Sequence, residues 1–124
     1  MQSVKIRCII KYSLAPDTFL HEKKEIPVMS KSIHTEAVDR LFDAVLSLRT
    51  KEECYAFFED ICTVNELPSL SQRLEVARML KLGRTYLEIS EKTGASTATI
   101  SRVNRSLTYG NDGYDIAFRN LKDE

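Results

Sequence analysis

The sequence of 124 residues contains no tryptophan, four glycines and three prolines. Because glycine and proline interrupt regular structure, their scarcity predicts long elements, and helices more than sheet. No apolar run approaches the roughly 18 residues that a membrane-spanning helix needs. Lys5, Arg7 and Lys11 interrupt the N-terminal apolar segment, which therefore lacks the core of a signal peptide. These absences predict one soluble domain without a membrane segment.

The three cysteines, Cys8, Cys54 and Cys62, form no CxxC pair. Cys54 and Cys62 lie on one predicted helix, about 12 Å apart along its axis, which is too far for a disulfide. Free thiols are typical of a reducing cytoplasm, and this spacing indicates no metal site. His21 and His34 are isolated and no glycine-rich phosphate loop is present, so we expect neither an enzyme nor a bound cofactor.

Residues 1–31 differ from the rest of the chain because basic residues outnumber acidic ones there. One interpretation is an extension that precedes the usual start of translation, with Met29 as that start. The other is an N-terminal arm that packs on the domain or on a partner. Residues 32–124 are predicted to form the domain itself.

Two amphipathic helices are predicted to begin this domain. The first starts near Thr35, and helical spacing places five apolar residues on one of its faces: Ala37, Leu41, Ala44, Val45 and Leu48. Thr50 and Glu53 have the spacing of a capping box, which predicts the start of the second helix. Its inward residues are predicted to be Cys54, Phe57, Phe58 and Ile61.

A third helix is predicted before Gly83, a residue type that often ends helices. Pro68 is expected to stop the preceding helix, and Ser69 or Ser71 to cap the new one. An apolar stripe of the new helix is predicted at Leu70, Leu74, Ala77 and Leu80 or Met79. The last residues, 113–124, are predicted to form a final short helix after a turn.

Residues 86–105 have the pattern of a helix-turn-helix. Thr85 and Glu88 form a second capping box before a short helix that ends at Gly94, where the turn needs a left-handed backbone. Ser90 is small where the two helices must cross closely. Four apolar residues have the spacing that packs the helices together: Ile89, Ala95, Ile100 and Val103.

The second of these helices has an end suited to the major groove of DNA. Its first residues, Ser96, Thr97 and Ala98, are short, and its early amides can face phosphates. Arg102 and Arg105 can bind guanine or phosphate. Thr85 and Ser101 complete the predicted DNA-binding set. Residues 72–107 hold seven basic and three acidic residues (net +4), whereas residues 34–70 hold three and eight (net −5), and this asymmetry favours phosphate binding by one face.

The segment "LPSLSQRLEVARMLKLGRTYLEISEKTGASTATISRVNRSL" resembles the Trp repressor family, and more closely its TrpR-like YerC/YecD-type members. The resemblance covers roughly residues 32–122. It implies an all-helical, intertwined homodimer with two recognition helices that enter successive major grooves of double-stranded DNA. The implied function is that of a sequence-specific transcriptional regulator, a repressor. The alternative is a helical protein-interaction module that does not bind DNA.

The resemblance also implies positions for a corepressor pocket, which in the family holds tryptophan between two arginines and beside a serine. The second arginine corresponds to Arg102 and the serine to Ser106. Gln72 stands at the position of the first arginine, with Arg73 one residue away. A glycine that lies beside the ligand in the repressor is replaced by Val103, whose side chain would occupy that space. Tryptophan is therefore not expected, and a different small molecule or none stays open.

Overall fold

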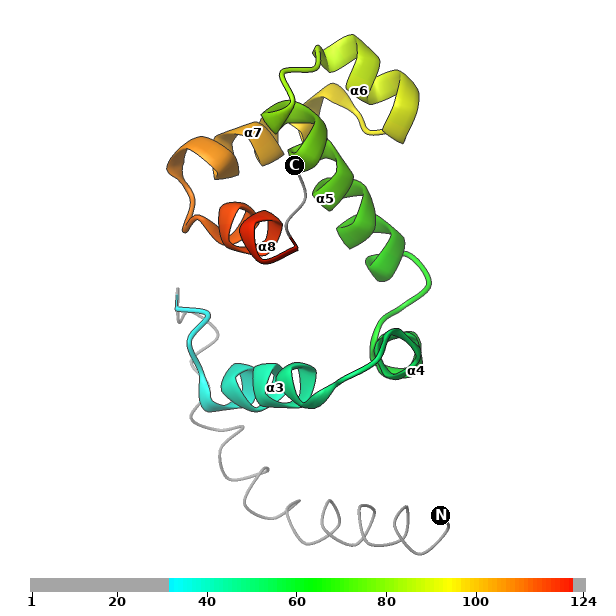
Figure 1. Cartoon of the computed structure of the whole chain (residues 1–124), viewed down its shortest axis with the longest axis vertical. Helices are drawn as coiled ribbons and strands as arrows, with labels where there is room; N and C mark the ends of the chain where they lie inside the picture. Colours follow the sequence, from blue (N-terminus) through cyan, green and yellow to red (C-terminus); the bar gives the residue numbers. More distant parts are fainter. Residues whose placement is uncertain (1–31, 122–124) are drawn as a thin grey trace, which may run out of the picture. The chain divides into compact units, whose positions relative to one another are not determined.

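The computed structural model describes residues 32–121, and every regular element in this range is a helix (Figure 1). The predicted N-terminal arm and the alternative start at Met29 lie outside the described residues. One compact unit ends at Ser47 and a second begins at Leu48. Helix α3 (Glu36–Ser47) belongs to the first unit, and the second contains α4 (Lys51–Ile61), α5 (Glu66–Lys81), α6 (Tyr86–Thr93), α7 (Thr97–Tyr109) and α8 (Gly113–Leu121). The predicted all-helical class is confirmed.

Helix α3 begins where the sequence indicates, because the Thr35 hydroxyl accepts a hydrogen bond from the Val38 amide at 3.2 Å. None of its residues is buried. Leu41 lies on the predicted apolar face and is 36% exposed, and Leu46 is 82% exposed. Within residues 32–121, the apolar residues of α3 are therefore largely exposed.

Helix α4 has the predicted cap in an altered form. The Thr50 hydroxyl accepts from the Glu53 amide at 3.1 Å, as a capping box requires. The Glu53 carboxylate, however, accepts from the amide of Arg49 at 2.7 Å instead of the amide of Thr50. The prediction that Ile61 points inward is wrong for the single chain, in which Ile61 is half exposed. Cys54, Phe57 and Phe58 are half-buried.

Helix α5 begins earlier than predicted. It starts at Glu66, so Pro68 lies in its first turn, and neither Ser69 nor Ser71 is its cap. Proline is compatible with this place because the first amides of a helix have no partner within the helix. No side chain caps the helix at Asn65. The Glu66 carboxylate accepts a hydrogen bond from the amide of Thr63 at 2.7 Å, just before the helix begins.

The predicted apolar stripe of α5 is confirmed in its second half, since Ala77 and Met79 are buried together with Val76. It is wrong in its first half, because Leu70 and Leu74 are exposed by 46% and 40%. The predicted end of the helix is confirmed, since Gly83 has a left-handed φ of 75° and donates to the carbonyl of Leu80 at 3.0 Å.

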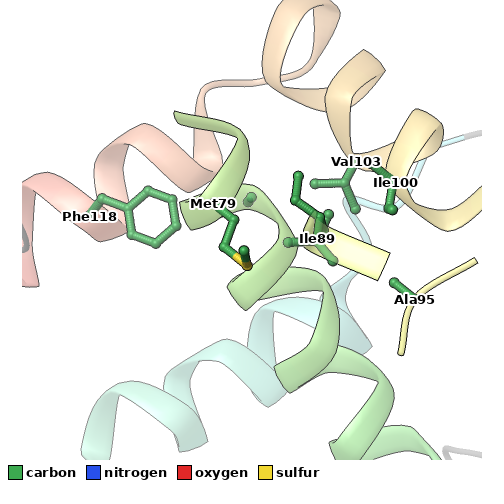
Figure 2. Packing of buried hydrophobic residues seen from close by; sticks show 8 residues of the cluster. Met79, Ile89, Ala95, Ile100, Val103 and Phe118 are labelled. Carbon is green, nitrogen blue, oxygen red and sulfur yellow. The ribbon is translucent and has the colours of Figure 1, made fainter. Parts of the chain in front are cut away.

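The core lies where α5 meets α6, α7 and α8, which gather around it in Figure 1. Figure 2 shows Ile100 and Val103 of α7 beside Ile89 of α6, and the ring of Phe118 of α8 directed toward Met79 of α5. The complete cluster is Val76, Ala77, Met79, Ile89, Ala95, Ile100, Val103 and Phe118. An ion pair between Lys81 and Asp115 adds a polar link between α5 and α8. Helix α5 is therefore the element on which the three C-terminal helices are assembled.

Two neighbouring residues of α6 test this account of the core. Ile89 is fully buried, whereas Leu87 is 69% exposed. We expect Ile89→Ala to lower the free energy of unfolding by about 2–5 kcal/mol, because it leaves a cavity. Leu87→Ala should change it by about 0.5 kcal/mol or less, as is usual at exposed positions. Urea denaturation of the full chain measures both, and equal losses would contradict the account.

Candidate nucleic-acid interface

The turn between α6 and α7 has the predicted left-handed glycine. Gly94 has a φ of 71°, and its amide donates to the carbonyl of Ser90 at 2.9 Å. A Cβ added at this position would lie 4.0 Å from Nε2 of Gln72, so the site has room for a side chain. The glycine is required by backbone conformation and not by lack of space.

Thr93 organises the same turn through both its side chain and its backbone. Its hydroxyl donates to the carbonyl of Ile89 at 2.7 Å and accepts from the amide of Ala95 at 3.1 Å. Its carbonyl accepts from Nε2 of Gln72 at 3.0 Å. The bond from Gln72 joins α5 to the turn across 21 positions of sequence, and no local pattern in the sequence indicates it.

The predicted capping box at the start of α6 is confirmed. The Thr85 hydroxyl accepts from the amide of Glu88 at 3.2 Å, and the Glu88 carboxylate accepts from the amide of Thr85 at 2.8 Å. The Thr85 hydroxyl also donates to the Glu88 carboxylate at 3.0 Å. The bonds that this carboxylate accepts from the Thr85 amide and hydroxyl lower the pKa of Glu88 below its ordinary value of 4.5, and the charge of Arg84 adds to the effect.

Helix α7 begins at a serine cap. The hydroxyl of Ser96 accepts from the amide of Thr99 and lies 3.1 Å from the Thr99 hydroxyl. Thr97 and Ala98 follow it and are exposed. The start of α7 therefore presents short side chains to solvent, as predicted, while Ser96 itself also serves the helix as its cap.

Opposite faces of α7 have different environments. Ile100 and Val103 are buried in the core, whereas Ser101, Arg102 and Arg105 are exposed and form what we call the outer face of α7. None of the ion pairs within residues 32–121 involves Arg102 or Arg105. Both guanidinium groups are thus available to an anionic ligand, although their contact with DNA stays a prediction.

The residues of the predicted effector pocket do not converge on a common hydrogen-bonded site. Gln72 bonds to the turn, and the Ser106 hydroxyl donates to the backbone carbonyl of Arg102 at 3.2 Å. Arg73 is half-buried, and no hydrogen bond joins its side chain to Arg102 or Ser106 among residues 32–121. Val103 is 2% exposed, so its branched side chain belongs to the core.

Two other features are absent from the described residues, a metal-binding cluster and a membrane-spanning helix. No group of three or more His, Cys, Asp or Glu residues that could hold a metal ion occurs there. No helix in residues 32–121 is both long and apolar enough to cross a membrane.

Comparison with known proteins decides the family. The model of the Trp repressor protein family matches residues 36–122. The chain belongs to the Trp repressor family. Its fold and helix-turn-helix are therefore those of a family of DNA-binding regulators, not of enzymes.

Individual relatives agree with this assignment. The chain is 60% identical over 86 residues to the uncharacterised protein YerC of Bacillus subtilis (strain 168). The matched region covers 69% of this chain and 83% of the relative. The crystal structure of a TrpR-like protein from Eubacterium eligens is similar with a TM-score of 0.71 and 66% identity, over 73% of this chain and 94% of that one. The crystal structure of a candidate Trp repressor from Staphylococcus aureus is similar with a TM-score of 0.72 and 56% identity, over 74% of this chain and 92% of that one. The predicted YerC-type resemblance is confirmed.

The capping box predicts a pH dependence of stability. The pKa of Glu88 is lowered in the folded chain, so its contribution is present above the unfolded pKa and is lost as pH falls through the folded value. The variant Glu88→Gln keeps a side chain that can accept the Thr85 amide but cannot titrate. We expect the free energy of unfolding to fall less steeply below about pH 4.5 in this variant than in the wild type. Parallel slopes in urea titrations from pH 6 to pH 3 would contradict the assigned role of Glu88.

Proposed function

We propose that the protein is a sequence-specific DNA-binding transcriptional repressor, which acts in the cytoplasm as a homodimer and places α7 in the major groove. The observation that carries the proposal is the division of α7 into a buried face and an outer face. The core holds Ile100 and Val103, so it fixes which side chains point away from the domain. Exposed on that side are Ser101, Arg102 and Arg105.

The chemistry of the exposed residues favours DNA over other partners. Arginine can form two parallel hydrogen bonds with guanine in the major groove, and serine or threonine hydroxyls bond to bases or phosphates. Thr97 and Ala98 are small and exposed at the start of α7, which allows the end of the helix to approach base edges. Thr85 at the start of α6 is also exposed, and a phosphate contact there requires its hydroxyl to donate to a phosphate oxygen in place of the Glu88 carboxylate.

Exposed apolar residues support a homodimer. In the first unit, Phe42 and Leu46 of α3 are exposed by 54% and 82%. In the second unit, Tyr55 and Ile61 of α4 and Val64 after it are exposed by 51% or more. Such a concentration of exposed apolar side chains is unusual for a monomer and typical of a subunit interface. A second copy of the chain is the occupant that the family suggests.

A tryptophan effector does not fit the residues at the corresponding positions. Val103 is part of the core, and Gln72 and Ser106 form bonds within the chain. We therefore propose a repressor whose DNA affinity tryptophan does not change, and the binding measurement below is to be made with and without it.

DNA binding is tested by selecting a binding sequence from random duplexes at low salt. The wild type should enrich one sequence, and its affinity should fall steeply as salt rises, because phosphate contacts release counterions. Arg102→Ala and Arg105→Ala should each weaken binding to the selected duplex by about 5- to 150-fold, the range for loss of a specific arginine contact. Arg119→Ala, at an exposed arginine of α8, is the matched control and should bind like the wild type.

The opposite result favours a protein-interaction module. If no sequence is enriched and the double variant of Arg102 and Arg105 binds duplexes as well as the wild type, the outer face of α7 is not a DNA interface.

The homodimer is tested by analytical ultracentrifugation. The wild type should sediment at twice the chain mass of 14.2 kDa. Leu46→Glu places a charge on the most exposed apolar residue of α3 and should shift the equilibrium toward monomer, because an unpaired charge would be buried in the interface. Ser47→Glu introduces the same charge at the next residue, which is polar and exposed, and should shift it less. A wild-type monomer at all concentrations would refute the dimer.

A further inference from the structure

Gln72 forms a long-range polar contact between α5 and the helix-turn-helix. Its side chain is half-buried, and its Nε2 donates to the carbonyl of Thr93 at 3.0 Å. The nearest atom to a Cβ built on Gly94 is this same Nε2. The amide of Gln72 thus lies directly against the turn, on the side of α5.

The carbonyl that Gln72 binds is one that needs a partner. Thr93 is the last residue of α6, and the last carbonyls of a helix have no amide within the helix to accept from. The carbonyl of Ser90, one turn earlier, receives the amide of Gly94, and that of Ile89 receives the hydroxyl of Thr93. Gln72 supplies the donor at Thr93 that the end of the helix lacks.

The hydrogen bond adds direction to a contact that is otherwise apolar. Ile89, Ile100 and Val103 pack on α5, and apolar packing has little preference for direction. A hydrogen bond weakens steeply when its angle changes. The bond from Gln72 therefore restricts rotation of the turn, and of α7 after it, relative to α5.

We propose that Gln72 is a positioning residue of the DNA interface: it sets the angle at which α7 is presented, and so separates sequence-specific from non-specific binding. The inference rests on the proposed function. Attraction to phosphates is long-ranged and tolerates a small rotation of the helix. Hydrogen bonds to base edges require correct geometry and do not tolerate such a rotation. Loss of Gln72 should therefore reduce discrimination between DNA sequences more than affinity for DNA as such.

The test compares wild type with Gln72→Met and Gln72→Glu, which keep the length of the side chain and remove its amide donor. Ser71→Met is the control, because it introduces the same methionine one residue earlier at an exposed position. The readout is the ratio of affinities for the selected duplex and for a scrambled duplex of the same length and composition. Because both affinities are measured on one variant, the added charge in Gln72→Glu affects both and largely cancels.

Both Gln72 variants should lower this ratio by about 2- to 12-fold, which corresponds to the loss of one ordinary hydrogen bond. The affinity of Gln72→Met for the scrambled duplex should stay close to that of the wild type, and that of Gln72→Glu should fall only by the effect of its added negative charge. Hydrogen exchange at the amides of Gly94 and Ala95 should become faster in both. Ser71→Met should change neither the ratio nor the exchange.

Three results would overturn the proposal. If the wild type discriminates and both variants keep its ratio, Gln72 is not a positioning residue, and the proposed DNA-binding function stands. If Gln72→Met weakens both duplexes equally, in step with a fall in melting temperature, Gln72 serves only folding. If the wild type itself binds both duplexes alike, the proposed function fails and the positioning role fails with it.

Discussion

The packing of Ile89, Ile100 and Val103 on the buried face of α5 is the interaction on which the rest of the structure depends. It brings together residues from three helices, two of which are too short to be stable alone in water. The same contact decides which side of α7 faces solvent. If Val103 is in the core, then Arg102 and Arg105 must point away from it, since residues one and two positions along a helix lie on different faces. The predicted interface is thus a direct consequence of the core.

The helix-turn-helix could be predicted from the sequence because its determinants are local. Gly94 adopts the left-handed backbone, Thr85 and Glu88 bond reciprocally, and the apolar residues at helical spacing are buried. Each of these features involves residues within one or two turns of each other. Periodicity and capping rules describe interactions of that range well.

The structure differs from the local rules where a residue has more than one compatible environment. Pro68 predicts a break, but proline is tolerated in the first turn of a helix, and α5 starts at Glu66. Leu70 and Ile61 are apolar and at helical spacing, which predicts that they are buried, yet both are exposed in the part of the chain that the structure describes. The bond from Gln72 to Thr93 joins positions 21 residues apart, and no rule of spacing predicts such a contact. These outcomes depend on tertiary or quaternary neighbours that a single sequence does not specify.

The two faces of α7 also separate substitutions that affect the packing of the core from substitutions that do not. The side chains of Thr97, Ala98, Ser101, Arg102 and Arg105 are all exposed, and none belongs to the core cluster. Substitution at these five positions, provided that the helix is kept, leaves the packing of the domain intact. A chain built in this way can acquire a new target without first having to acquire a new fold. Single substitutions can therefore change the target among proteins that share this scaffold. Each such substitution can be selected for its effect on binding, because the stability of the domain does not depend on it.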